Sequence, residues 1–277
     1  MALSFIPEIW SAKILGSLKK NLVYAQDGVV NRDYEGEIAN QGDTVRIRSV
    51  SRPTISSYTK NATLTYETLT DAQRSLLIDQ AKSFSFVVDD IDEAQASGAL
   101  DEATTEAAYG LRDTTDQYVA SLYTGAASAN QIGTVSVTTA ALAYTQLRKL
   151  SVKLDEANVP QEGRWCIVPP WYYGLLLEDD KFVRYDASGT TAGLRNGIVG
   201  QALGFDVMKS NNAVLVTGDD YAVMAGHKSA ITYAEQIVET EALRLQTTFG
   251  TGVRGLHVYG AKLVRPDAIA TVVASIT

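Results

Sequence analysis

Residues 97–125 read SGALDEATTEAAYGLRDTTDQYVASLYTG and predict a long amphipathic helix. Apolar side chains recur every three or four residues, which is the spacing of one helical face: Leu100, Ala103, Ala107, Leu111, Tyr118 and Leu122. The opposite face is polar and carries Asp101, Glu102, Glu106, Arg112, Asp113 and Asp116. Ser97 can cap the start of this helix and Gly125 can end it. An unbroken helix of this length spans about 40 Å, so we expect it to be a strut on which a sheet lies.

Two alternating segments before this helix predict a long β-hairpin. TVRIRSV at residues 44–50 and ATLTYETL at residues 62–69 place apolar and polar side chains in turn. The stretch between them is polar, and basic side chains occur along the segment: Arg46, Arg48, Arg52 and Lys60. Because a two-stranded hairpin is marginally stable in water on its own, we expect it either to pack on its own domain or to reach a neighbouring chain. We favour the neighbouring chain.

The first 24 residues predict a short helix with one apolar stripe. Ile9, Trp10 and Ile14 fall on this stripe, shortly after Phe5, and Pro7 suits the first helical turn. An exposed Trp and Ile require a partner surface. Two interpretations remain open, namely an ordinary terminal helix packed on its own domain and an arm packed on an adjacent subunit.

The second half of the sequence predicts an α/β lobe that begins after a small-residue linker at residues 126–133. A helix is expected at 138–158, and its core face carries Leu142, Leu147, Leu150 and Leu154. RWCIVPP then reads as a buried strand and WYYGLLLEDD as a short helix. A glycine-rich loop follows at 186–204, and a loop of that length is uncommon unless it is functional or mobile. We expect the strands after residue 235 to return to the first lobe.

Composition narrows the class of protein. The chain has 277 residues, 45% of them hydrophobic, which favours two lobes over one core. The formal net charge is −8, with acids and bases interspersed, and this argues against tight, broad binding to nucleic acid. Cys166 is the only cysteine, so the chain has no internal disulfide and no Cys-based zinc site. No apolar run approaches the roughly 18 residues of a membrane span, and no secretory signal is present.

Motifs for catalysis or cofactor binding fail on context. Residues 250–255 match GxGxxG, but the continuation LHVYGAKLV is a strand, whereas a dinucleotide site needs a helix there. The GHKS run at 226–229 lacks the spacing of a phosphate loop. There is no GxSxG or HExxH, and nothing brings His227 and His257 together. We therefore predict no catalytic, cofactor-binding or metal site, and a protein that is not an enzyme.

The order of these segments resembles the major capsid proteins of tailed bacteriophages with the HK97-type fold. The shared order is an N-terminal arm, a basic-tipped hairpin, the strand SFSFVVDDIDEAQ, a long helix, an α/β lobe with a glycine-rich loop, return strands and the closing FGTGVRGLHVYGAKLVRPDAIA. The Val-Tyr-Gly-Ala run at 258–261 before Arg265 and Pro266 looks like this family's usual ending. The resemblance covers nearly all of the chain.

The resemblance implies an α+β fold in four parts. Residues 1–42 would be the N-terminal arm, residues 43–68 the E-loop hairpin, residues 69–133 and 235–277 the peripheral domain with its spine helix at 97–125, and residues 134–234 the α/β axial domain. Two groups of side chains would contact neighbouring subunits. They are Arg46, Arg48, Arg52 and Lys60 in the hairpin, and Phe5, Ile9, Trp10 and Ile14 in the arm.

The implied function is that of a major capsid protein. Such a chain self-assembles into pentamers and hexamers that form an icosahedral shell around double-stranded DNA, which it contacts weakly and non-specifically. The resemblance places it in the virion after assembly in the cytoplasm of a bacterial host. Because the arm starts directly at Met1, with no scaffold-like extension, we expect a separate scaffolding protein and a portal. We expect Lys60 to make charge contacts rather than a covalent crosslink.

Three alternatives remain. An encapsulin-like nanocompartment would use the same fold to enclose cargo enzymes. A soluble α/β enzyme would be a monomer whose melting temperature responds to a ligand. A tail or other virion component would form tubes or rings rather than closed shells.

Overall fold

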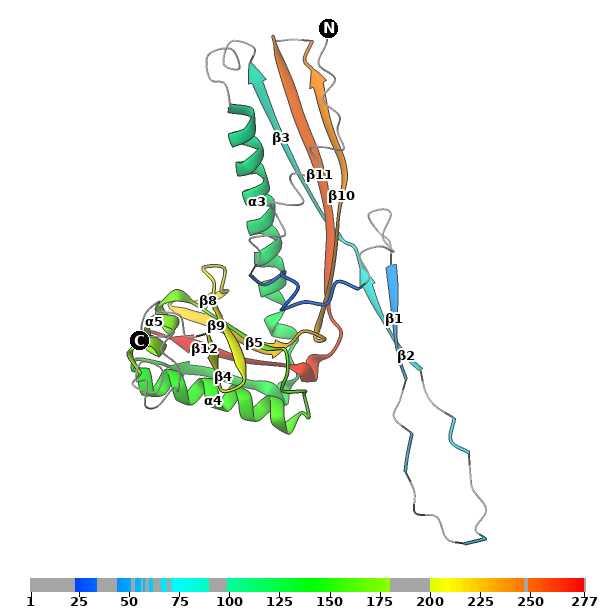
Figure 1. Ribbon diagram of the computed structural model, residues 1–277, viewed down its shortest axis with the longest axis vertical. Helices are drawn as coiled ribbons and strands as arrows, with labels where there is room; N and C mark the ends of the chain where they lie inside the picture. Colours follow the sequence, from blue (N-terminus) through cyan, green and yellow to red (C-terminus); the bar gives the residue numbers. More distant parts are fainter. Residues whose placement is uncertain are drawn as a thin grey trace.

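The computed structural model describes most of the chain from residue 23 onwards. The described residues are 23–33, 44–50, 53–55, 57, 60–61, 66–68, 71–89, 99–179, 200–246 and 249–276. They form a long lobe, an α/β lobe and a projecting hairpin, so the mixed α and β composition expected from the sequence is confirmed (Figure 1).

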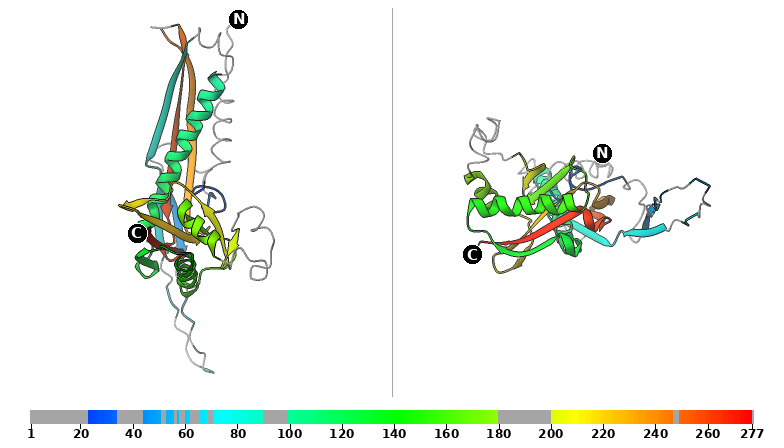
Figure 2. Two further views of the ribbon diagram at one scale, coloured as in Figure 1. Left: turned by 90° about the vertical axis from the view of Figure 1, so that its left-hand side faces the viewer. Right: turned by 90° about the horizontal axis from the view of Figure 1, so that it is seen from below.

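The long lobe consists of helix α3 (Ala99–Ser121) and a three-stranded antiparallel sheet. The strand order is β10 (Ile231–Arg244), β11 (Gly250–Leu263) and β3 (Gln80–Asp89). Helix α3 runs along this sheet and continues into a short 3-10 helix, η2 (Leu122–Gly125) (Figures 1 and 2). The predicted helix and the predicted strand before it are therefore both confirmed. The GxGxxG stretch lies within β11, as its strand-like continuation indicates.

Contacts between α3 and the sheet involve one face of β3 and β11. Phe84 packs against Ala108 and Leu111. The rings of Tyr118 and Tyr259 meet edge to face, with centroids 5.5 Å apart. Aromatic pairs of this geometry add to the free energy of simple burial. The helix thus acts as the strut that the sequence predicts.

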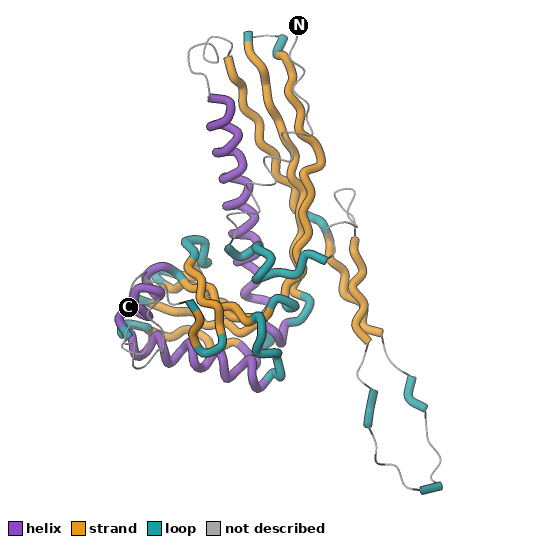
Figure 3. The backbone as a smooth tube through the Cα atoms, viewed as in Figure 1, coloured by secondary structure: helices purple, strands orange, loops and turns teal. Residues whose placement is uncertain are grey.

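The α/β lobe is built on a seven-stranded mixed sheet. Its path is β4-β12-β9-β5-β7-β6, with β8 paired to β9. The strands are β4 (Gln131–Ser136), β5 (Arg164–Val168), β6 (Gln201–Ala202), β7 (Phe205–Lys209), β8 (Leu215–Thr217), β9 (Asp220–His227) and β12 (Ile269–Ser275). Helices α4 (Ala140–Glu156) and α5 (Pro170–Glu178) belong to the same lobe (Figure 3).

Packing in the α/β lobe confirms most of the expected core. Every residue of β5 is buried, Cys166 included, and Leu147, Leu150 and Leu154 of α4 are fully buried. Leu142 is a correction, because it is 38% exposed and Ala143 takes the buried position beside it. The hydroxyl of Thr139 caps α4 by accepting the N–H of Leu142, which places Leu142 in the open first turn.

The last strand corrects the expected course of the chain. The sequence predicts that residues 235–277 return to the first lobe, but β12 lies in the seven-stranded sheet. There it pairs in parallel with β4 and antiparallel with β9. The 3-10 helix η4 (Pro266–Ala268) redirects the chain out of β11. Strand β4 also begins inside the predicted linker at 126–133. Of the glycine-rich segment at 186–204, residues 186–199 lie outside the described residues.

The hairpin pairs different strands from those predicted. Strand β1 (Thr44–Val50) is where the alternation predicts it, but it pairs antiparallel with β2 (Asp71–Leu77) in a register that runs from Thr44 opposite Leu77 to Val50 opposite Asp71. The partner strand was predicted at 62–69. Of this segment the structure describes residues 66–68, and the prediction is wrong for them because they have no strand pairing. We refer to residues 44–77 as the hairpin.

Candidate subunit interface

The hairpin projects away from both lobes (Figures 1 and 3). Large apolar side chains on it are exposed. Ile55 is 87% exposed and Tyr66 is 96% exposed, one on each leg of the loop beyond β1 and β2. The two legs are linked, because the N–H of Thr54 donates to Oε2 of Glu67 at 2.9 Å. Exposed isoleucine and tyrosine side chains are the kind of anchor that protein interfaces bury.

Among the described residues of the hairpin, those packed against the rest of the molecule lie at its base. Leu76 and the adjoining Ile78 are fully buried and pack with Ala234 and Val258 of the long lobe. Gly260 in β11 allows this close approach, because a Cβ there would lie 2.5 Å from the carbonyl oxygen of Leu77. The described residues beyond β1 and β2 are all exposed. The direction in which the hairpin projects therefore depends on the packing of its base.

The predicted interface residues are only partly placed. Arg46 and Arg48 lie in β1, opposite Ser75 and Gln73 of β2. Lys60 is exposed in a turn with Asn61, whose φ of 68° is left-handed. Arg52 lies outside the described residues, as do the arm residues Phe5, Ile9, Trp10 and Ile14. Their contacts with neighbouring subunits stay a prediction.

Residues 23–33, which we call the arm base, connect the N-terminal segment to the body of the protein. Four of its side chains are buried in a cluster with the C-terminal end of α3, β5 and the long sheet: Tyr24, Ala25, Val29 and Val30. Asn31 pairs with β10, since its N–H donates to the carbonyl oxygen of Ile231 and its carbonyl oxygen accepts the N–H of Tyr233. The arm base is therefore part of the folded core, and it fixes where the preceding segment emerges.

A buried carboxylate holds the arm base against α3. Oδ1 of Asp116 accepts the N–H of Val23 at 3.0 Å and that of Tyr24 at 2.7 Å, and Oδ2 accepts the side-chain amide of Asn212 at 3.1 Å. Burial raises the pKa of Asp116, and these hydrogen bonds oppose the shift. Asp116 is only 3% exposed, which corrects its expected place on the polar face of the helix.

A second polar cluster joins the arm base to the long sheet. The guanidinium of Arg32 contacts Oε1 of Glu235 at 2.8 Å, donates to the carbonyl oxygen of Ala25 at 2.6 Å, and lies 4.8 Å from the centroid of the Tyr233 ring. The hydroxyl of Tyr233 donates to Oε2 of Glu235 at 2.6 Å, and Nε2 of His257 lies 3.4 Å from that oxygen. The cluster is thus a buried ion pair with two aromatic neighbours.

The charge of Glu235 is set by these partners. Burial alone would raise its pKa, but the contacts with His257, Arg32 and Tyr233 together lower it to about 2. Glu235 therefore remains ionised over the range in which ordinary carboxyl groups titrate. Its partners lie on the arm base and on two strands, so the cluster joins elements and is not arranged as a reactive centre.

The described part of the chain offers neither a metal site nor a membrane-spanning helix. No group of three or more His, Cys, Asp or Glu side chains among those residues could hold a metal ion. None of the described helices is long and apolar enough to cross a membrane. His227 contacts Ser229, whereas His257 contacts Glu235, so the two histidines have different partners.

Comparisons with known proteins agree with this architecture. The profile of a family described as phage capsid protein matches residues 52–272. A solved structure of Mycobacterium phage Che8 is 35% identical, the alignment covers 91% of each chain, and the TM-score is 0.77. The capsid structure of the cyanophage P-SCSP1u is 19% identical, with 94% of this chain and 90% of that chain covered and a TM-score of 0.73.

An encapsulin is a more distant structural neighbour. The holo-SrpI encapsulin complex from Synechococcus elongatus is 10% identical, with 87% of this chain and 85% of that chain covered and a TM-score of 0.54. At this identity the likeness concerns the fold alone. No curated protein matches the sequence.

Proposed function

Because this chain belongs to the phage capsid protein family, we propose that it forms pentamers and hexamers that close into an icosahedral shell around double-stranded DNA. The family is structural, so the chain is a shell subunit of the virion and not an enzyme. Its fold is the HK97-type capsid fold. In that fold the long lobe corresponds to the peripheral domain and the α/β lobe to the axial domain.

The projecting hairpin carries the proposal. It exposes Ile55 and Tyr66 almost completely, although apolar side chains of this size are normally covered. A neighbouring subunit that received the hairpin would bury both side chains and would support a loop that is marginal by itself. Obligate interfaces of shell subunits typically exceed about 2,000 Å², and an extended hairpin offers such area without a large core.

The N-terminal segment adds a second overlap. The arm base is locked to the body by Asp116 and Arg32, so the segment before it leaves from a fixed point. Phe5, Ile9, Trp10 and Ile14 would then pack on an adjacent subunit. The basic side chains Arg46, Arg48, Arg52 and Lys60 would meet acidic surface on the neighbour, where charges at the rim set register and association rate more than affinity.

Contact with the genome would be weak. The net charge of −8 does not favour a continuous basic surface for phosphates. The shell would hold DNA by enclosing it, with a separate scaffolding protein directing closure and a portal occupying one vertex. Assembly would take place in the cytoplasm of the bacterial host.

Electron microscopy of purified particles tests this function. The chain is expressed with and without the scaffolding protein of its phage, and particles are imaged in negative stain. Closed shells with five-fold and six-fold capsomers are expected. Particles from infected cells should contain nuclease-protected DNA, whereas an encapsulin-like compartment would contain protein cargo. A monodisperse monomer under all conditions would contradict the proposal.

A further inference from the structure

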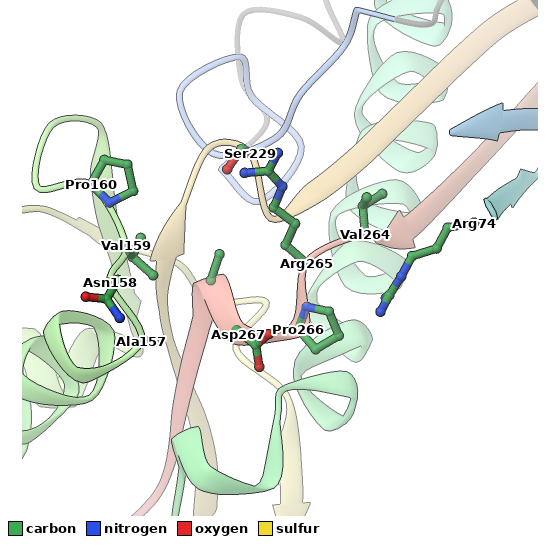
Figure 4. A pocket seen from close by; sticks show the side chains of 11 residues that line it. Arg74, Ala157, Asn158, Val159, Pro160, Ser229, Val264, Arg265, Pro266 and Asp267 are labelled. Carbon is green, nitrogen blue, oxygen red and sulfur yellow. The ribbon is translucent and has the colours of Figure 1, made fainter. Parts of the chain in front are cut away.

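A pocket with two arginine side chains lies where the hairpin base, the long lobe and the α/β lobe meet (Figure 4). Its volume is about 330 Å³. Residues 157–160, which follow α4, form one wall, and residues 264–268, which link β11 to β12, form another. Arg74 of β2 and Ser229 of the β9–β10 turn complete the lining. Each of the three parts of the fold thus contributes to one concave surface.

Both arginines lack an acidic partner within the described residues. Nη1 of Arg74 donates only to the carbonyl oxygen of Leu263, at a long 3.4 Å. Arg265 extends toward Ser229 and forms no ion pair there (Figure 4). Some other arginines of the described chain do have carboxylate partners, for example Arg164 with Asp155 at 2.7 Å. Both guanidinium groups can therefore take an anion that enters the pocket.

The pocket is cationic as a whole. Asp267 also lines it, so the two guanidinium groups leave one positive charge in excess. The positive charge of this region also affects the pKa of the nearby His227. Burial lowers the pKa of His227, a backbone hydrogen bond with Glu162 opposes the shift, and the charges of Arg164 and Arg265 lower it further. An anion bound to Arg74 or to Arg265 would offset this excess charge and use the planar donors of guanidinium.

From these observations we infer that the pocket receives an acidic side chain of a second copy of this chain. The inference rests on the proposed shell function and adds a specific contact to it. The chain carries 32 acidic against 24 basic side chains other than histidine, so a neighbouring copy presents an excess of carboxylates. The pocket adjoins the base of the hairpin, which is the element proposed to overlap a neighbour. An ion pair formed here would lock the direction of the hairpin at the moment of docking.

A carboxylate fits the pocket better than the phosphate backbone of DNA does. DNA binding of useful strength needs several cations spread along a surface. This pocket is concave and small, and it places a carboxylate of its own, Asp267, among the lining groups. A single planar carboxylate can contact one guanidinium side-on.

Charge-neutral variants test the inference in the assembled shell. Arg74→Gln, Arg265→Gln and the double variant are compared with Lys228→Gln, which removes an exposed cation next to Ser229 but outside the pocket lining. The double variant should lower the yield of closed shells by about tenfold or more, since each interface charge pair that is broken slows closure or speeds dissociation. Lys228→Gln should leave the yield within about twofold. The melting temperature of the unassembled subunit should not change, because both arginines are exposed.

The failure of this inference and that of the proposed function give different results. If the wild-type chain forms shells and the double variant forms them equally well, the pocket contact is wrong and the shell function stands. If the wild-type chain forms no shells, both are wrong.

A photoreactive benzophenone side chain at Pro160, an exposed residue of the pocket wall, identifies the occupant directly. In wild-type shells, mass spectrometry should find an adduct with a peptide of another copy that contains Asp or Glu, and this adduct should be absent from dissociated subunits. An adduct with DNA, an adduct with a peptide that lacks an acid, or no adduct between copies would overturn the inference.

Discussion

The Asp116 carboxylate, in the second half of α3, accepts the backbone N–H of Tyr24 at 2.7 Å, although 92 positions separate the two residues in sequence. The same carboxylate accepts the N–H of Val23 and the amide of Asn212, which lies in the α/β lobe. One side chain therefore connects the arm base, the long helix and the second lobe. The point from which the N-terminal segment leaves the body depends on this connection.

We expect Asp116→Leu to destabilise the subunit by about 3 kcal/mol, because it leaves one buried and two partly buried donors without an acceptor. Asp116→Asn is the matched control. Its amide oxygen can still accept the N–H groups of Val23 and Tyr24, so the loss should be about 1 kcal/mol or less. Urea unfolding of the unassembled subunit measures both values. Equal losses in the two variants would show that the acceptor is not the source of the stability.

Acid should weaken the cluster around Glu235. Its pKa is lowered from 4.5 in the unfolded chain to about 2 in the fold. A depressed carboxyl pKa contributes stability that is fully present above about pH 4.5 and is lost as the pH falls toward 2. The amount is about 3 kcal/mol. Glu235→Gln should remove this part of the acid dependence.

The control for Glu235 is Glu241→Gln. Glu241 pairs with Arg254 on the surface of the same sheet, where the partner guanidinium is largely exposed to solvent. Exposed pairs contribute little, so this variant should keep the wild-type acid profile. The free energy of unfolding is measured from about pH 6 to pH 2 for all three chains. Parallel profiles for the wild type and Glu235→Gln would contradict the assignment. Asp116, whose raised pKa gives a contribution of opposite sign, is common to all of them and cancels in the comparison.

Two glycine-to-alanine variants should shift stability in opposite directions. In Gly260→Ala the new methyl group would overlap the carbonyl oxygen of Leu77 and approach Ile78, so the hairpin base must move. A loss of about 1–3 kcal/mol is expected. In Gly110→Ala the methyl group meets nothing within 4 Å on an exposed helical position, and a gain of up to about 1 kcal/mol is expected. Thermal melts of both variants test the pair, and a stable Gly260→Ala subunit would show that the hairpin base tolerates displacement.

Local patterns in the sequence predicted the elements well where one face is buried throughout. The alternation of Phe84 and Phe86 and the apolar run in β5 correspond to strands that pack on a helix or in a sheet centre. The alternation of apolar and polar residues at 62–69 predicted a strand wrongly, because such a pattern forms a strand only where a partner strand is present. The true partner, β2, reads DAQRSLL and buries a single side chain of those described, Leu76.

Contacts between residues that are far apart in the chain could not be predicted from the sequence. Nothing in the alternation of β12 indicates which sheet it joins, since its neighbours β4 and β9 are distant in the chain. Asp116 looked like one more acid on a polar face, because its buried partners are backbone groups near residue 24. The nearby Thr115, Val119 and Ala120, all fully buried, are local signs that this position faces inward. Arg74 and Arg265 are also far apart in the chain, and only the folded structure shows that they line the same pocket.

The hairpin should be needed for shell closure but not for folding of the subunit. Deletion of residues 51–61 removes exposed loop and leaves the buried base at Leu76 and Ile78. The double substitution Ile55→Ser and Tyr66→Ser is gentler, because both side chains are 87% or more exposed and contribute little to the isolated fold. Thr54→Val is the control variant, because the hydrogen bond to Glu67 uses the backbone N–H of Thr54 and is kept in this variant.

Both hairpin variants should melt within about 1 °C of the wild type, because the altered side chains are exposed and about 1 kcal/mol shifts the melting temperature of a chain of this size by only about 2–4 °C. Their yield of closed shells in negative-stain micrographs should fall by about tenfold or more, because two anchor side chains of an interface typically contribute at least 1–2 kcal/mol each. Thr54→Val should assemble normally. Normal particles from the deletion would mean that the hairpin does not hold neighbouring subunits together, and the contacts that close the shell would then have to come from the arm and the two lobes.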